Sequence, residues 1–180
     1  GRCGKDAIDS CDALVANTRN VPIEEIEWHY PLRVERYELN PEQVAPGKWR
    51  GGLGIVRETR FLQDGTVTCE GDRHKEAPKG IFGGADGASA SMTKNPDSTN
   101  PISLESKLSD EEFAAGDVLQ IRTPCGGGYG NPFERDPNKV LDDVLDDFTT
   151  LESAKTCYGV VIDPSTMTVD MAATQALRAN

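Results

Sequence analysis

The sequence predicts an α+β fold, in which a β-rich body runs from residue 1 to about residue 130 and a small helical segment follows over residues 131–180. Three observations predict it. The body alternates short β-prone segments with glycine and proline, and its segment at residues 31–39 shows no helical stripe. Beyond it, apolar residues recur at three- and four-residue spacing. Finally, 18 Gly and 11 Pro among 180 residues indicate many turns, unlike a helical bundle.

Four segments of the body are expected to be strands, because they mix apolar and polar residues at short range and are bounded by turn residues. They are residues 31–39, 55–62, 66–70 and 118–122. Asp64 and Gly65 separate the second segment from the third, and both residues tolerate positive φ. This dipeptide therefore predicts a hairpin that pairs those two strands.

The stretch from about residue 80 to residue 100 is rich in Gly, Ala, Ser, Asn and Pro. Such a composition can bury little apolar surface. We therefore expect a long surface loop, or a segment that is ordered only by a partner.

The helical segment is predicted from its caps and its apolar stripe. Asp136 is an N-cap and Pro137 suits the first helical position, where a missing N–H does no harm. The stripe of the helix that follows is made of Val140, Leu141, Val144, Leu145 and Phe148.

A second helix and a last helix are expected after this one. Thr149 and Glu152 form a capping box, and Gly159 is a natural C-terminal stop. Residues 160–162 predict a short buried strand, and Asp170 is an N-cap for the last helix.

Charge and cysteine content exclude several classes of protein. The chain has 19 Lys+Arg and 30 Asp+Glu, so its net charge of −11 offers no basic stripe for nucleic acid. Its longest apolar run, residues 13–16, is far too short to enter a membrane. Five cysteines at irregular spacing, without Cys-x-x-Cys, favour free thiols in a reducing cytoplasm, although Cys3 and Cys11 could pair or share a metal.

An acidic row lies on the first predicted helix: Asp142, Asp143, Asp146 and Asp147. Calcium-binding loops carry glycine and are irregular, unlike a helix. We therefore interpret the row as a solvated face, on which Lys139 offers Asp143 a compensating charge.

A glycine-rich loop is the first candidate site. Gly126, Gly127, Gly128, Tyr129 and Gly130 follow a predicted strand. The N–H groups of such a loop can bind an oxyanion or a phosphate. The alternative is a tight turn where backbones approach closely, since no helix and no Gly-Lys-Ser/Thr ending follows.

Asp72 and Arg73 form the second candidate site, with a role as an ion-paired group that positions the substrate. A purely structural ion pair is the alternative. His74 next to them could act as an acid or a base near neutral pH. The other histidine, His29, lies between Trp28 and Tyr30, and its aromatic setting favours packing.

Several motifs together carry a family resemblance. In chain order they are NTRNVPIE (17–24), YPLRVERYEL (30–39), PGKWRGGLG (46–54), DR (72–73), GIFGG (80–84), GDV (116–118), TPCGGGYGNP (123–132), ERDP (134–137) and YGVV (158–161). In this order and spacing they resemble the C-terminal part of the hydantoinase B/oxoprolinase family across almost the whole chain. That family includes the B component of N-methylhydantoinases, 5-oxoprolinase and the large subunit of acetone and acetophenone carboxylases.

The resemblance implies a heteromeric enzyme. A hydantoinase-A-type subunit would bind ATP and Mg²⁺ and phosphorylate a carbonyl oxygen, and the B-type component would complete the site of hydrolysis or carboxylation. Because B-type components are several times longer, the chain corresponds to about their last third. The resemblance places their metal-binding His/Asp set upstream, so we expect no cofactor or metal on this chain and a divalent metal in the upstream part. Residues 76–80 depart from the family, which usually has an apolar or aromatic residue near this Pro-x-Gly.

The resemblance therefore implies the C-terminal piece, or a naturally split small subunit, of a B-type component that is inactive alone. Its partners would be the A-type subunit and the upstream B-type part, in a higher hetero-oligomer. The first residue is Gly1 and not Met, which indicates a processed or engineered chain or part of a longer one. The expected reaction is ATP-dependent hydrolysis of a cyclic amide such as a hydantoin, oxoproline or a lactam. One alternative is ATP-dependent carboxylation of a ketone, and another is a non-catalytic assembly module.

Overall fold

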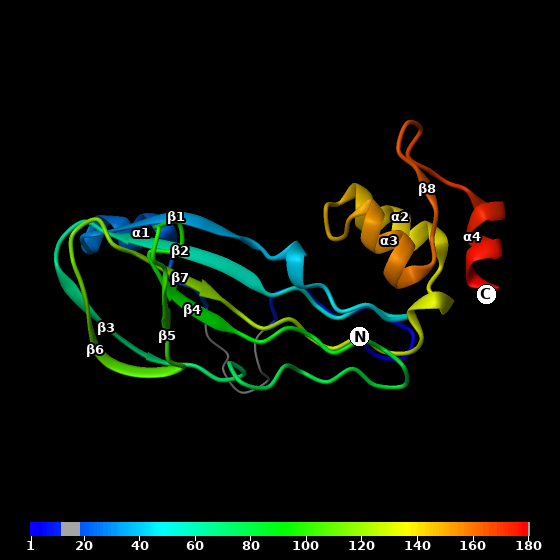
Figure 1. The fold of residues 1–180 in the computed structure, drawn as a ribbon. Coiled ribbons are helices and arrows are strands. Elements are labelled where there is room, and N and C mark those ends of the chain that lie inside the picture. Colours follow the sequence, from blue (N-terminus) through cyan, green and yellow to red (C-terminus); the bar gives the residue numbers. More distant parts are fainter. Residues whose placement is uncertain (12–18, 180) are drawn as a thin grey trace.

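The structure is a computed structural model that describes residues 1–11 and 19–179. The apolar run at residues 13–16 and the first two residues of the motif at 17–24 lie outside these described residues. An elongated β body carries a cluster of helices at one end (Figure 1), so the α+β prediction is confirmed. No helix of the described residues is both long and apolar enough to cross a membrane.

The body contains two antiparallel sheets. The larger has the strand order β1-β2-β7-β4-β5 and the smaller pairs β3 with β6. The strands are β1 (Leu32–Leu39), β2 (Ile55–Phe61), β3 (Gly65–Glu70), β4 (Ser91–Lys94), β5 (Ile102–Leu104), β6 (Lys107–Phe113) and β7 (Val118–Arg122). The four strands predicted from sequence, β1, β2, β3 and β7, are confirmed.

The predicted hairpin between β2 and β3 is wrong. Asp64 does lie in the short connection between β2 and β3, where its carboxylate accepts a hydrogen bond from the Ala115 amide at 2.8 Å. However, β2 pairs with β1 along one edge and with β7 along the other, and β3 pairs with β6. Both edges of β2 are therefore occupied by remote strands, and this connection carries the chain into the second sheet.

The predicted loop over residues 80–100 is correct only in part. Residues 80–90 contain no helix or regular strand, but β4 follows and lies between β7 and β5 in the larger sheet. Met92 on this strand is 2% exposed. The segment is thus ordered by the backbone of β7 and by burial of one large side chain, which its average composition did not indicate.

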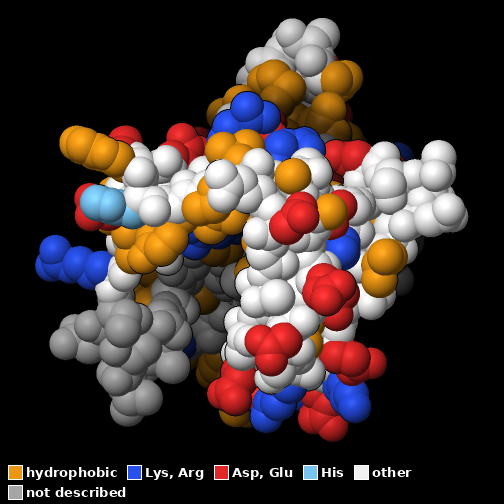
Figure 2. All heavy atoms as spheres, turned by 90° about the vertical axis from the view of Figure 1, so that its left-hand side faces the viewer, with side chains coloured by type: hydrophobic (Ala, Val, Ile, Leu, Met, Phe, Trp, Pro, Cys, Tyr) orange, Lys and Arg blue, Asp and Glu red, His pale blue; other side chains and the backbone are white. Residues whose placement is uncertain are grey.

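Two separate apolar clusters hold the molecule together. In the body, Phe61 stacks on Phe113 at 4.7 Å between ring centroids, and Leu119 completes the buried cluster. The helical segment has its own core, made of Val140, Val144, Ala154, Tyr158, Val160 and Ile162. The end of the body that bears α1 exposes hydrophobic as well as charged side chains (Figure 2).

The helical segment has the predicted caps at most of its ends. Its elements are η2 (Pro132–Glu134), α2 (Pro137–Leu145), α3 (Leu151–Tyr158), the hairpin β8 (Ile162–Asp163) and β9 (Thr168–Val169), and α4 (Met171–Arg178). Asp136 and Asp170 accept hydrogen bonds from the first turns of α2 and α4. Gly159 ends α3 at φ 62°, in the left-handed region that favours glycine. The remaining helices, α1 (Ile23–His29) and the short η1 (Pro41–Gln43), flank β1.

The predicted capping box at Thr149 is wrong by one residue. The N-cap of α3 is Thr150, whose hydroxyl accepts a hydrogen bond from the Ser153 amide at 3.0 Å. Thr149 is buried, and its hydroxyl has no hydrogen-bond partner within the described part of the chain. The sequence offers Thr at both positions, so either could cap the helix. Tertiary packing buries Thr149, and Thr150 therefore caps α3.

Candidate functional site

Asp72 and Arg73 lie where the chain leaves β3, at the mouth of a surface depression. The other lining residues are Gly71, His74, Lys75, Glu76, Ser106 and Lys107. Arg73 has a φ of 63°, and its carbonyl accepts a hydrogen bond from the Ala90 amide at 2.9 Å. Both predicted site residues are exposed. Within the described residues no ion pair joins Asp72 to Arg73. The structural ion pair considered as the alternative is therefore not present, and the expectation that the positioning group is itself ion-paired is also wrong.

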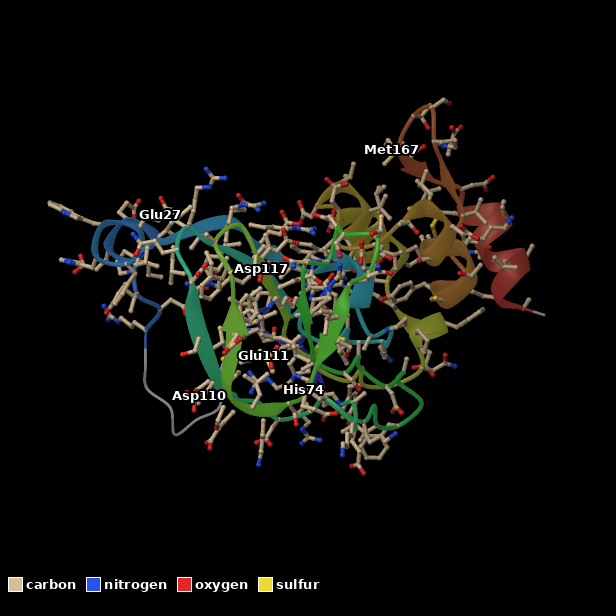
Figure 3. All side chains as sticks on the ribbon, turned by 60° about the vertical axis from the view of Figure 1, so that its left-hand side comes forward. Glu27, His74, Asp110, Glu111, Asp117 and Met167 are labelled. Carbon is tan, nitrogen blue, oxygen red and sulfur yellow. The ribbon has the colours of Figure 1, made fainter. Side chains whose placement is uncertain are left out.

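His74 is oriented by the backbone next to it. Its Nδ1 lies 3.2 Å from the carbonyl oxygen of Asp72, which can only accept, so a hydrogen bond between the two requires the proton on Nδ1. The Nε2 atom is buried and has no hydrogen-bond partner among the described residues. Figure 3 shows His74 on the lower side of the body, near the crossing from β3 to β4. By contrast, His29 is exposed, stacks on Trp28 and has its Nε2 3.3 Å from Glu25 Oε1, so the expectation that it is packed in the interior is wrong.

Gly126 to Gly130 belong to a close-packed layer, named here the glycine layer, that is built from residues 45–54, 78–87 and 124–130. Its strongest feature is the distance between backbones. A Cβ on Gly51 would lie 1.9 Å from the Gly126 carbonyl oxygen, and one on Gly128 would lie 2.1 Å from the Pro46 oxygen. Since real Cβ atoms do not approach backbone so closely, glycine is required at these positions. The structure thus agrees with the alternative stated from the sequence, a tight turn where backbones approach closely.

The amide groups of the loop are used inside the glycine layer. Four of the five donate to backbone carbonyls at 2.9–3.0 Å: Gly126 to Gly52, Gly128 to Ala85, Tyr129 to Trp49, and Gly130 to Ile81. In this conformation those four N–H groups are not offered to an oxyanion or a phosphate. The expected role of these four amides as donors to a ligand is therefore wrong.

The structure does not bring the two predicted parts into one depression. Gly126 lines a second depression, together with Asp9, Gly52, Thr123 and other residues. No described residue lines both depressions. A single site made of Asp72, Arg73 and the glycine-rich loop would therefore need the two surfaces to be bridged by other parts of an assembly.

A buried ion cluster joins the glycine layer to the helices, and sequence reasoning missed it. Asp143 accepts hydrogen bonds from Arg135 Nη2 at 2.8 Å and from Arg50 Nε at 3.2 Å. Arg50 also pairs with Asp9 at 2.7 Å, and Arg135 pairs with Asp6 at 2.6 Å. Arg50, Arg135 and Asp143 are all less than a tenth exposed.

The solvated-face interpretation is therefore wrong for Asp143. A signal for this was available in the sequence, because Asp143 lies between the core positions Val140 and Val144 on the helix. Lys139, expected to compensate Asp143, instead lies over the Trp49 ring with its Nζ 4.8 Å from the centroid. Asp142 and Asp146 are exposed, as expected.

Burial and pairing shift the titration of the cluster in opposite directions. Burial raises the pKa of Asp143, and the flanking Arg135 and Arg50 offset part of that rise. Burial would also raise the pKa of Asp6, but the hydrogen bond and charge of Arg135, the Arg50 amide and the charge of Lys139 together outweigh burial, so the pKa is lowered. The cluster has three carboxylates and two guanidinium groups. Their opposite charges compensate one another where they are buried, so the cluster can hold the helical segment against the glycine layer.

Metal binding finds no support in the described part of the chain. No group of three or more His, Cys, Asp or Glu side chains there is arranged to hold a metal ion. Cys3 is a free thiol, so it does not pair with Cys11, and Cys125 is buried and accepts a hydrogen bond from the Ala88 amide at 2.9 Å.

Comparison with known proteins agrees with the resemblance seen in the motifs. Residues 1–132, well over half of the chain, match the family described as hydantoinase B/oxoprolinase. The chain belongs to the hydantoinase B/oxoprolinase family. It corresponds to the C-terminal portion of that family's longer members.

Two relatives of this hydantoinase B/oxoprolinase chain are bacterial enzyme subunits. A protein assigned as the B component of a D-/L-hydantoinase from Pseudomonas sp. strain NS671 is 54% identical over 166 residues, covering 92% of this chain and 28% of the relative. The beta component of the caprolactamase of Pseudomonas jessenii is 30% identical over 175 residues, covering 87% of this chain and 28% of the relative. The chain thus spans 28% of the length of each, and both names imply partner subunits.

Solved structures show the same fold. The crystal structure of the ATP-dependent caprolactamase from Pseudomonas jessenii superposes with a TM-score of 0.74 at 27% identity, over 88% of this chain and 28% of that chain. The nucleotide-free structure of acetone carboxylase gives a TM-score of 0.80 at 21% identity, over 97% of this chain and 28% of that chain. At that identity the second likeness concerns the fold alone.

Proposed function

We propose that this chain is the C-terminal part of the B-type component of a heteromeric, cytoplasmic, ATP-dependent enzyme that hydrolyses a cyclic amide, such as a hydantoin, oxoproline or a lactam. The observation that carries the proposal is the 54% identity to the B component of a hydantoinase over 92% of the chain. In the proposal, ATP and Mg²⁺ bind to an A-type partner subunit, which activates the carbonyl oxygen by phosphorylation. A divalent metal, where one is used, belongs to the upstream part of the B-type component.

Within this enzyme, Asp72 and Arg73 position the activated substrate. Three observations support that role: both side chains are exposed, they line a depression, and the backbone of Arg73 is fixed by the Ala90 amide. A guanidinium group stays charged at every working pH and can bind an anionic oxygen through two N–H groups. The Gly126–Gly130 loop contributes through the surface at Gly126, which lines the second depression.

The reaction is tested on the assembled enzyme, isolated through a tag on this chain. We expect ADP and the ring-opened product to form when ATP is supplied with a hydantoin, with oxoproline or with caprolactam. ADP formation that requires a ketone plus bicarbonate would instead establish the carboxylase alternative. Recovery of the chain without an ATP-hydrolysing partner, as a stable monomer, would contradict both.

Arg73→Ala tests the site. Because the variant removes a charge that contacts the substrate in the proposal, we expect kcat of the assembled enzyme to fall about tenfold or more. The complex should elute unchanged from a sizing column, since Arg73 makes no ion pair within the described residues. Arg33→Ala, at an exposed arginine of β1 that pairs with Glu35, is the control for loss of a surface charge and should keep full activity. If Arg73→Ala dissociated the complex while the enzyme that stayed assembled kept full activity, Arg73 would have a role in assembly and not in the site.

The non-catalytic assembly module stays a second candidate. Large hydrophobic side chains at the surface favour it, led by Trp28 at 84% exposed and Phe82 at 76% exposed. An assembled enzyme that turns over equally well with Asp72→Asn and with Arg73→Ala would support this candidate over a contribution to the site.

A further inference from the structure

The turn over residues 80–84 presents an aromatic side chain in an unusual way. Phe82 has a φ of 52°, in the left-handed region that bulky residues rarely adopt, and it is 76% exposed. Its neighbour Ile81 is 50% exposed. The strained backbone of this turn is not offset by burial of the Phe82 ring within this chain. Strained residues of this kind concentrate at functional sites.

The turn is rigid, because the glycine layer holds it on both sides. The Ile81 amide donates to the Gly128 carbonyl, and the Ile81 carbonyl accepts from the amides of Gly84 and Gly130, all at 3.0–3.1 Å. A Cβ on Gly84 would lie 2.3 Å from the backbone of Gly128, so the turn cannot shift toward the layer. The Phe82 ring rests on Tyr129 at 5.2 Å between centroids. The ring is thus fixed in place before any contact forms, which lowers the entropic cost of binding.

The same layer holds Gly1. Its amino group donates to the Gly127 carbonyl at 2.7 Å, one residue before the carbonyl that accepts from Ile81. Figure 1 shows the N-terminus close to the green turn at this end of the body. In the longer relatives most of the chain lies outside the matched C-terminal portion. A segment joined to Gly1, as in a longer relative, would therefore enter the glycine layer beside the Phe82 turn.

We infer that the Phe82 turn, with Ile81 and Tyr129, is the docking surface for the part of a B-type component that precedes this region in the longer relatives. Phe82 is the anchor, an aromatic ring that enters an apolar pocket of that upstream part. The inference rests on the proposed function in one respect, namely that this chain works as part of a B-type component. Its occupant is a polypeptide, and no substrate, nucleotide or metal takes part in the contact.

The test measures binding and stability on the same variants. The upstream part of the D-/L-hydantoinase B component from Pseudomonas sp. strain NS671, produced as a separate polypeptide, is titrated into this 180-residue chain. We expect a complex with the unchanged chain and a Kd at least about tenfold higher with Phe82→Gly. Thermal unfolding of the chain alone should show a Tm that is equal or higher in Phe82→Gly, because glycine adopts positive φ without strain.

Two variants serve as controls, and every other outcome overturns the inference. Phe82→Tyr keeps the ring and should bind like the unchanged chain, as should Leu62→Ala, which removes a 49%-exposed side chain next to β2. Absence of a complex with the unchanged chain, or equal Kd values for Phe82→Gly and the unchanged chain, would refute the docking surface. A lower Tm together with lost binding would show that Phe82 has a structural role instead. ATP-dependent hydrolysis is assayed separately, so a complex that forms but turns over no cyclic amide would refute only the proposed function.

Discussion

The helical segment and the glycine layer hold their chains in place by different means. In the helical segment, six buried apolar side chains form a core, and they come from residues close together in the sequence. In the glycine layer, three remote segments meet through backbone hydrogen bonds and glycine contacts. Side-chain burial tolerates some variation in size, whereas contact between backbones allows no added atom. The Phe82 turn proposed as a docking surface and the surface at Gly126 belong to the second, less tolerant region.

The ion cluster connects these two regions. Asp6 and Asp9 come from the N-terminal segment, Arg50 from the glycine layer, and Arg135 and Asp143 from the helical segment. Removing one partner of a buried ion pair leaves a charge without compensation. Variants of this cluster therefore test whether the two regions unfold as one unit.

The largest effect is expected for Asp143→Ala. The variant leaves Arg50 and Arg135 buried without their shared carboxylate, so the free energy of unfolding should fall by about 3–5 kcal/mol. Denaturant unfolding followed by circular dichroism measures it. Asp142→Ala removes a neighbouring exposed carboxylate and should change stability by about 0.5 kcal/mol or less. Equal stabilities for the two variants would show that the cluster is not a joint.

The next largest effect is expected for Gly51→Ala in the glycine layer. Its new methyl group would lie 1.9 Å from a carbonyl oxygen, so the layer must open, at a cost of about 1–3 kcal/mol or more. Gly65→Ala is the matched control, because a Cβ there meets only the Phe61 ring at 3.5 Å. Melting temperatures of both variants decide the point, and a Gly51→Ala protein as stable as the control would contradict the close packing.

A smaller effect separates the two threonines before α3. Thr150→Ala removes the N-cap and should destabilise the protein by about 1 kcal/mol. Thr149→Val replaces a buried hydroxyl that has no partner in the described residues, so stability should stay the same or rise slightly. If Thr149→Val were instead less stable in urea than Thr150→Ala, Thr149 would be the N-cap, as the sequence predicts.

The smallest effect is a pH dependence, because the carboxylates involved are partly open to solvent. The pKa of Asp6 and that of Asp9 are lowered from the ordinary value of 3.8, so both groups bind protons less readily in the folded state. Their contribution to stability is present above pH 3.8 and is lost as the pH falls below it. Unfolding curves between about pH 5 and about pH 2 should show this loss, and Asp6→Asn should make it shallower. If the dependence of stability on pH were the same in Asp6→Asn as in the unchanged chain, other groups would cause the loss of stability at low pH.

Local signals predicted those parts of the fold that depend on neighbouring residues. The caps at Asp136 and Asp170 and the stop at Gly159 each use atoms within a few residues, and all three are confirmed. The strand segments were predicted, but the partner of β2 was not, because pairing is a competition among remote strands. For the same reason β4 was missed: its order comes from β7 and not from its own composition.

The candidate site shows the same division. The sequence indicated Asp72 and Arg73, and it allowed the glycine-rich loop either a ligand or close packing. Only the structure decided for packing, because the acceptors of Gly126, Gly128, Tyr129 and Gly130 lie about 40 to 80 residues away.

By itself, the sequence determined the α+β class, the family and the helix ends marked by Asp136, Gly159 and Asp170, since periodicity, ordered motifs and caps are properties of short segments. The tertiary structure alone decided the pairing of the strands, the burial of Asp143 between two arginines and the exposure of Phe82 on a rigid turn. Each of these depends on which remote segments meet, and a side chain's charge or size does not specify its distant neighbours.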